Sequence, residues 1–202
     1  MGPTRRAVVD EQVKFVEHSA ARTRILDAAL DLFAKHGVSA TSLQMIADDI
    51  GVTKAAVYHQ FPAKDQIVLA VTERELSRLL PALEQAEAHG DGVQARDELL
   101  VLVIDMAVQD RRLASALQFD PVMINLLGEH EPFQRFMARL YGVLLADSGE
   151  DARVEAAMLA GAIGSAVMNP LVADIDDDTL RSRLTDLSRR LLGLPERGRR
   201  GR

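Results

Sequence analysis

The sequence predicts an all-α protein, and two observations carry this prediction. Apolar residues recur at intervals of three and four positions along most of the 202 residues, as amphipathic helices require. No stretch shows the strict apolar–polar alternation of a half-buried strand, and no internal repeat competes with the helical pattern. We therefore expect an N-terminal three-helix domain followed by a larger C-terminal helical domain.

The segment 41–64 predicts two short helices joined by a tight turn. The first begins near Ser42, with the Thr41 side chain as its N-cap. Gly51 ends this helix, because glycine adopts a left-handed conformation without steric cost. The expected buried face of the first helix comprises Leu43, Ile46, Ala47 and Ile50.

The second helix of the pair begins after Thr53, which is expected to be its N-cap. Its inward side chains are expected to be Ala56 and Val57. Two helices connected in this way form a helix-turn-helix, a unit whose second helix fits the DNA major groove. The segment therefore predicts a DNA-reading unit.

An amphipathic helix over residues 22–37 precedes this unit, with Ile25, Leu26, Ala29, Leu32 and Phe33 on one face. Taken together, residues 22–69, about a quarter of the chain, resemble the DNA-binding domain of the TetR family of bacterial transcriptional regulators. The residues that carry the likeness are Phe33, Gly37, Thr41, Ser42, Ile46, Ala47, Gly51, Val52, Lys54, Tyr58, His59, Phe61, Lys64 and Asp65.

The resemblance implies a helix-turn-helix domain at residues 22–69 and a ligand-binding and dimerisation domain at residues 70–194. An N-terminal tail covers residues 1–21, and a basic flexible tail covers residues 195–202. Within the first tail, valines at helical spacing suggest a short extra helix from Asp10 to Ser19, and disorder is the alternative. Arg5 and Arg6 suit a DNA minor groove.

The predicted DNA contacts follow from position and chemistry. Lys54 opens the recognition helix, where its cation suits a phosphate, and Tyr58 lies one turn further along the same face. Gln44 can form a bidentate pair with adenine, whereas Ala55 offers only an apolar contact with a thymine methyl. The resemblance implies that Lys64 is the family's phosphate-binding lysine. The full predicted set is Thr41, Ser42, Gln44, Thr53, Lys54, Ala55, Tyr58, His59 and Lys64.

The net charge of −6 lies outside this unit. Residues 1–65 contain eight basic and eight acidic side chains, so the proposed reading head is neutral. A neutral head neutralises few phosphates, and we therefore expect a homodimer on a near-palindromic operator, with recognition helices about 34–36 Å apart or somewhat more.

Composition also excludes several classes of protein. The chain has no cysteine, no N-terminal signal-peptide pattern and no apolar run near the roughly 20 residues of a membrane span. Its histidines are far apart, and no phosphate-binding glycine loop is present. We expect a cytoplasmic, soluble protein that is not an enzyme, uses no metal or cofactor and has no membrane partner.

Every clear segment after Asp65 is helical. The first is a long helix over residues 65–88 that bends at Pro81. The others are expected at 93–109, 113–117, 122–127, 132–146, 151–168 and 178–192.

The last two helices predict a dimer interface. Small residues on the first let helix axes approach, and leucines form a seam on the second; the alternative is that both faces are intramolecular core. The predicted interface residues are Ala157, Gly161, Gly164, Leu180, Leu184, Leu187 and Leu191.

The central helices predict a cavity for a largely apolar small molecule, because methionine adapts to irregular ligands and tyrosine adds a polar group. The alternative is ordinary core. The candidate ligand contacts are Met106, Phe119, Met123, Phe133, Phe136, Met137 and Tyr141.

The predicted function is that of a repressor that a small effector releases from operator DNA. The alternatives are a helical protein-interaction protein and a DNA-binding protein without a small-molecule ligand.

Overall fold

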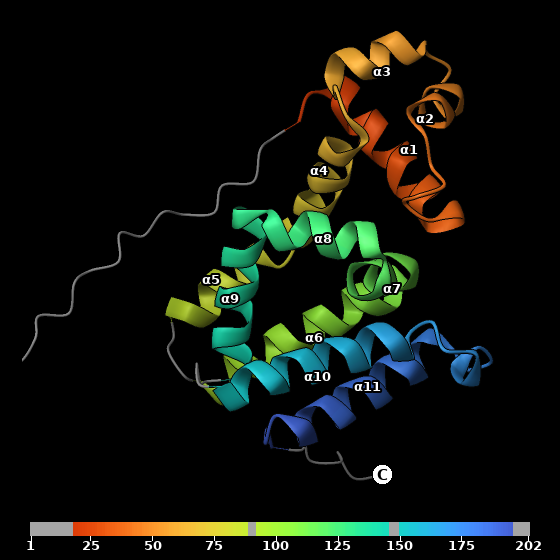
Figure 1. Cartoon of the computed structure of the whole chain (residues 1–202). Helices are drawn as coiled ribbons and strands as arrows, with labels where there is room; N and C mark the ends of the chain where they lie inside the picture. Colours follow the sequence, from red (N-terminus) through yellow and green to blue (C-terminus); the bar gives the residue numbers. More distant parts are fainter. Residues whose placement is uncertain (1–17, 89–91, 146–149, 196–202) are drawn as a thin grey trace, which may run out of the picture.

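The computed structural model describes residues 18–88, 92–145 and 150–195, and these ranges fold into eleven α-helices and one 3₁₀ turn without a strand (Figure 1). The helices are α1 (Ala20–His36), α2 (Leu43–Asp49), α3 (Lys54–Gln60), α4 (Lys64–Ser77), α5 (Leu80–Ala88), α6 (Val93–Gln109), α7 (Arg111–Phe119), α8 (Pro121–Glu129), α9 (Glu131–Leu145), α10 (Glu150–Ala166) and α11 (Asp177–Leu191), with the 3₁₀ turn at Pro170–Val172. The all-α prediction is therefore confirmed.

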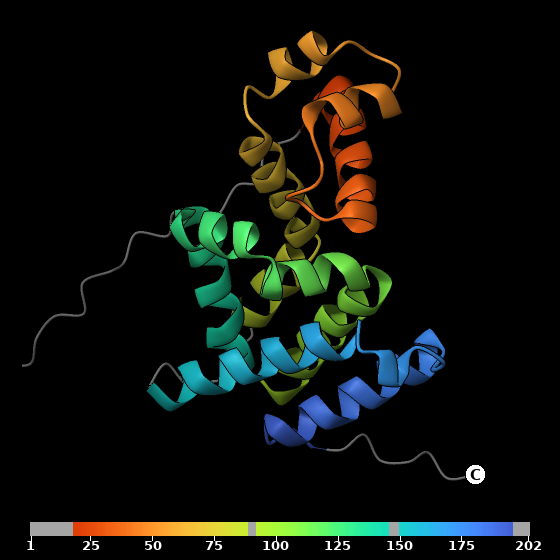
Figure 2. The same cartoon turned by 45° about the vertical axis from the view of Figure 1, so that its right-hand side comes forward.

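The helices form two regions joined by α4. Both views place α1–α3 at one end of the molecule and α10 and α11 at the other (Figures 1 and 2). The helices α5–α9 lie between these ends. No helix within the described ranges is both long enough and apolar enough to traverse a lipid bilayer.

The start of the chain differs from the prediction. α1 begins at Ala20, inside the expected tail, because Ser19 is extended and its side chain accepts the N–H of Arg22 at 3.4 Å. Ser19 is thus an N-cap and not the end of an extra helix. His18 is not helical either, and residues 10–17 of that predicted helix, Arg5, Arg6 and the basic segment 196–202 lie outside the described residues.

The single bent helix predicted over residues 65–88 is wrong. α4 ends at Ser77, and the N–H groups of Arg78 and Leu79 bond carbonyls only three residues back. α5 then starts at Leu80 and places Pro81 in its first turn, where the missing N–H of proline costs nothing. The break therefore precedes the proline.

The core around α1–α3 also involves the larger region. Buried side chains of α1–α4 form one apolar cluster with Leu113 of α7 and with Met123 and Leu127 of α8. A second cluster joins α5, α6, α9, α10 and α11. Arg189 of α11 is buried and donates two hydrogen bonds, of 2.5 and 3.0 Å, to the Asp97 carboxylate of α6. The C-terminal helix is thereby anchored to the body of the protein.

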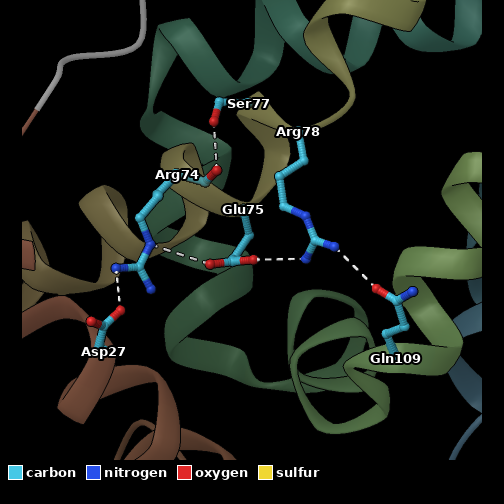
Figure 3. A network of polar contacts seen from close by, with 6 residues as sticks. All are labelled: Asp27, Arg74, Glu75, Ser77, Arg78 and Gln109. Carbon is cyan, nitrogen blue, oxygen red and sulfur yellow. Dashed lines mark hydrogen bonds and ion pairs between the residues drawn. The ribbon is translucent and has the colours of Figure 1, made fainter.

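A polar network ties α4 to both regions (Figure 3). The buried carboxylate of Glu75 accepts a hydrogen bond from Arg74 Nε and another from Arg78 Nη1, each of 3.2 Å. Arg74 also donates to Asp27 of α1 at 2.8 Å, and Arg78 donates to Gln109 of α6 at 3.0 Å. One carboxylate therefore positions the two arginines that link α4 to α1 and to α6.

Replacing Glu75 should loosen this junction. We expect Glu75→Gln to lower the free energy of unfolding by about 1–3 kcal/mol. Each oxygen of the Glu75 carboxylate accepts a hydrogen bond from one arginine, whereas the amide of glutamine is uncharged and has only one oxygen. Denaturant unfolding followed by circular dichroism measures the change. The control is Glu84→Gln on the exposed face of α5. Equal stability of the two variants would contradict the role assigned to Glu75.

Candidate nucleic-acid interface and ligand cavity

The turn between α2 and α3 is built from caps and one glycine. Ser42 Oγ accepts the N–H of Met45 at 3.2 Å and begins α2. Gly51 has φ of +69°, the left-handed conformation predicted for it. Thr53 Oγ1 then accepts the N–H of Ala56 at 3.2 Å and begins α3, as predicted.

α3 stands at the end of the molecule with one side against the core. Val57 is fully buried, whereas Lys54, Ala55 and His59 are exposed and Tyr58 is 57% exposed. The exposed positions lie within two turns of one another, so they form a single surface patch, which we call the α3 face. The structure thus brings together four of the predicted DNA contacts.

Ala56 was expected to be buried, and that prediction is wrong. The seven residues of α3 reach the core through Val57, followed by the fully buried Phe61 at the helix end. Ala56 precedes Val57 by about 100° around the helix, which turns it towards solvent. It enlarges the exposed apolar part of the α3 face.

Thr41 does not have the capping role predicted for it. Its side chain is buried, and Oγ1 donates to the carbonyl of Gly37 at 2.8 Å. Its neighbour Ser42 provides the cap and is exposed, next to the turn that precedes α2. Thr41 therefore stabilises the α1–α2 turn and has no free side-chain hydroxyl for DNA.

Two further predicted contacts are engaged within the protein. Lys64 Nζ donates to the carbonyls of Val38 and Ser39 at 2.8 and 3.3 Å, which ties the start of α4 to the α1–α2 turn. The exposed Gln44 amide donates to Asp48 Oδ1 at 2.7 Å. Both side chains are therefore held within the protein in this structure.

Two arginines of α1 hold the unit together, and sequence reasoning missed both. The Arg22 guanidinium lies 4.2 Å from the centroid of the Phe61 ring, a cation–π arrangement. Arg24 donates to the carbonyl of Ile50 at 3.1 Å, beyond the end of α2. Because their partners lie more than 25 positions away, no local pattern reveals these contacts.

A cavity of about 100 Å³ lies in the larger region. Three of the predicted ligand contacts, Met106, Met137 and Tyr141, line this cavity. Burial raises the pKa of Tyr141 to about 12, so its hydroxyl stays neutral at ordinary pH. The remaining walls come chiefly from aliphatic side chains of α4, α6, α7, α9 and α10 and of the α4–α5 connection. Asp110 is the one carboxylate among the described lining residues.

Four predicted ligand contacts do not line this cavity. Phe136 is fully buried in the core of the larger region, and Met123 is buried in the cluster shared with α1–α4. Phe133 packs between the two clusters, and Phe119 is 53% exposed at the end of α7. A stripe of aromatic and methionine residues indicates burial but does not separate core from cavity wall.

The predicted interface residues of α10 and α11 divide into two groups. Leu180 and Leu184 are buried in the chain's own core, and Gly164 is buried beside the cavity. These three positions therefore face inward and agree with the alternative to a dimer interface, in which these residues belong to the intramolecular core. Ala157, Leu187 and Leu191 are exposed, and Gly161 is half-buried.

Further apolar side chains on the outer side of these helices are uncovered. Val154, Met158 and Leu187 are each more than half exposed, and Leu171 of the intervening turn is 85% exposed. Solvent-exposed apolar residues gathered on neighbouring helices mark an interaction surface. We call these positions, with Ala157 and Leu191, the α10–α11 face.

Comparison with known proteins agrees with this architecture. The family model described as "Bacterial regulatory proteins, tetR family" matches residues 25–71. The transcriptional regulator AcrR of Shigella flexneri is 37% identical over 98 residues, which are 48% of this chain and 46% of that protein. The repressor KstR2 of Rhodococcus jostii is 33% identical over 104 residues, 52% and 51% of the two chains. The matches thus span about half the length of these relatives.

Solved structures extend the likeness to nearly the whole chain. A TetR-like regulator from Rhodococcus sp. RHA1 matches with a TM-score of 0.64 at 23% identity, over 88% of this chain and 98% of that one. A TetR/AcrR-family regulator from Thermobifida fusca matches with a TM-score of 0.54 at 27% identity, over 91% of this chain and 100% of that one. The helix-turn-helix at residues 25–71 thus matches the tetR family of bacterial regulatory proteins, and nearly the whole chain has the fold of TetR-like regulators.

Proposed function

We propose that this protein is a transcriptional regulator that binds a near-palindromic operator as a homodimer and is released by a small effector. The observation that carries the proposal is the exposed α3 face on a helix-turn-helix whose two helices are both capped. Lys54 can neutralise a phosphate, and the Tyr58 hydroxyl can bond a phosphate or a base edge. The relatives AcrR and KstR2, named as transcriptional regulator and repressor, support the same activity.

Dimerisation supports operator binding because a single DNA-binding domain carries few cations and can neutralise few DNA phosphates. A two-fold axis through the α10–α11 face would bury the apolar side chains of both copies in a self-complementary contact. That face lies at the opposite end of the molecule from α3 (Figure 1). A two-fold axis that runs along the length of the molecule, past the α10–α11 face, would place the two α3 faces at the same end of the dimer, as two half-sites require.

The cavity supports release by an effector because α4 spans both regions. Its first half packs with α1–α3, while Leu76 near its end lines the cavity beside Leu79. A ligand somewhat larger than the cavity must push these walls apart. It releases the operator only if it binds the displaced arrangement more tightly than the DNA-bound one.

The first test concerns DNA. We expect Lys54→Ala to weaken operator binding at every sequence and to lower the salt slope by about 1 per subunit, because one phosphate contact is lost. Fluorescence anisotropy on a fragment selected from the source genome, at several salt concentrations, measures both effects. Lys35→Ala is the matched control, since Lys35 lies in the last turn of α1, away from α3 (Figure 1). Unchanged affinity of Lys54→Ala would refute the interface.

The second test concerns the dimer. We expect Leu187→Glu to convert the protein to monomers, because a buried unpaired carboxylate in a desolvated apolar contact costs several kcal/mol. Sedimentation measures the mass, and circular dichroism checks that the helices remain. Ile124→Glu, at an exposed position of α8, is the control that should leave the mass unchanged. A dimeric Leu187→Glu protein would place the interface elsewhere.

A further inference from the structure

Asp110 gives the cavity one strongly polar point. The residue lies between α6 and α7, and its side chain is half-buried at the cavity wall. Most of the other described lining residues are aliphatic or methionine, and Tyr141 is neutral. An apolar chamber with one carboxylate is a binding arrangement that discriminates ligands by a single group.

Within the part of the chain that the structure describes, no cationic side chain is paired with this carboxylate. It accepts a hydrogen bond from the backbone N–H of Leu113 in the first turn of α7. The positive charge of Arg78 acts on it, but Arg78 is hydrogen-bonded to Glu75 and Gln109. Among the described residues, no ion pair reaches Asp110.

The surroundings of Asp110 disfavour its negative charge. Burial raises the pKa of this carboxyl, and the negative charge of Glu75 raises it further, with a smaller contribution from Asp31. The Leu113 N–H and Arg78 act in the opposite direction without reversing the shift. A cation placed at this wall would relieve both the desolvation and the repulsion.

Capping does not explain why the residue is charged. An aspartate before α7 is a good N-cap, but asparagine caps a helix equally well. Only one hydrogen bond to the helix is present, and an ionised carboxylate has about four acceptor sites. The charge is therefore available to a ligand.

We infer that the effector is a small amphiphilic cation, a protonated amine on a body of about one ring. The inference rests on the proposed function, in which this cavity holds the effector. The ammonium group would bond Asp110 and the body would lie against Met106, Met137 and Ile163. A cavity of about 150 Å³ accepts benzene, so about 100 Å³ fits one ring after a small adjustment, which methionine allows.

Three probes that differ only in one group test the inference. Benzylamine, benzyl alcohol and benzoate are titrated into the full chain at neutral pH, and ligand-observed NMR gives each Kd. We expect benzylamine to bind about tenfold more tightly than benzyl alcohol, as a charge-assisted bond implies, and benzoate to bind least. Asp110→Asn keeps the cap of α7 and should remove the preference for the amine while leaving the alcohol unchanged.

Asp120→Asn is the matched control. Asp120 caps α8 through the N–H groups of Val122 and Met123 and lies outside the cavity, so the amine preference should persist in this variant.

Equal binding of amine and alcohol to the unmodified protein, or a preference that survives Asp110→Asn, would overturn the inference and leave the cavity as a site for neutral ligands. If no probe binds, both the inference and the effector site fail, whereas operator binding by the α3 face is measured separately.

Discussion

The arrangement of the two regions depends on the hydrogen bonds that the Glu75 carboxylate accepts from Arg74 and Arg78. A buried charge is stable only while it stays paired, and this one is paired by arginines whose other bonds reach Asp27 on α1 and Gln109 on α6. Moving α4 relative to α1 or α6 must therefore break a charged hydrogen bond or carry its partner along. Such a junction favours a few discrete arrangements over a continuous range, which is what a regulator with two states needs.

The cavity adjoins this junction. Asp110 follows Gln109 directly, and the negative charge of Glu75 helps to raise the pKa of Asp110. Under the proposal above, a cation bound at Asp110 would change the electrostatic balance around Glu75 and Arg78 at one end of α4. The other end of α4 is held by Lys64 to the turn before α2. One helix thus has an electrostatic contact with the cavity at its end and a hydrogen-bonded contact with the reading head at its start.

Local features of the chain could be predicted from sequence, and distant contacts could not. Thr53 as a cap, Gly51 with positive φ and the helix at 93–109 depend on residues a few positions apart, so their pattern is visible in the sequence. Lys64 on Val38 and Arg24 on Ile50 join positions 26 apart, and their partners are carbonyls that no side-chain pattern reveals. Leu180 and Leu187 are seven residues apart and lie on nearly the same side of α11. Leu180 is nevertheless buried and Leu187 exposed, because the covered side of α11 shifts along the helix, from Leu180 and Leu184 to Ser188 and Arg189. Sequence spacing alone does not say which side a neighbouring helix covers.

The sharing of one apolar cluster between α1–α4 and α7–α8 affects how the protein can be divided. Leu113, Met123 and Leu127 close the core under the reading head. A fragment that stops after α4 would uncover this surface to water, so the head is expected to unfold together with the body as one cooperative unit. Chimeras that exchange reading heads between relatives would accordingly need to transfer the facing side chains of α7 and α8 as well, since the graft boundary runs through a packed interior and not through a linker.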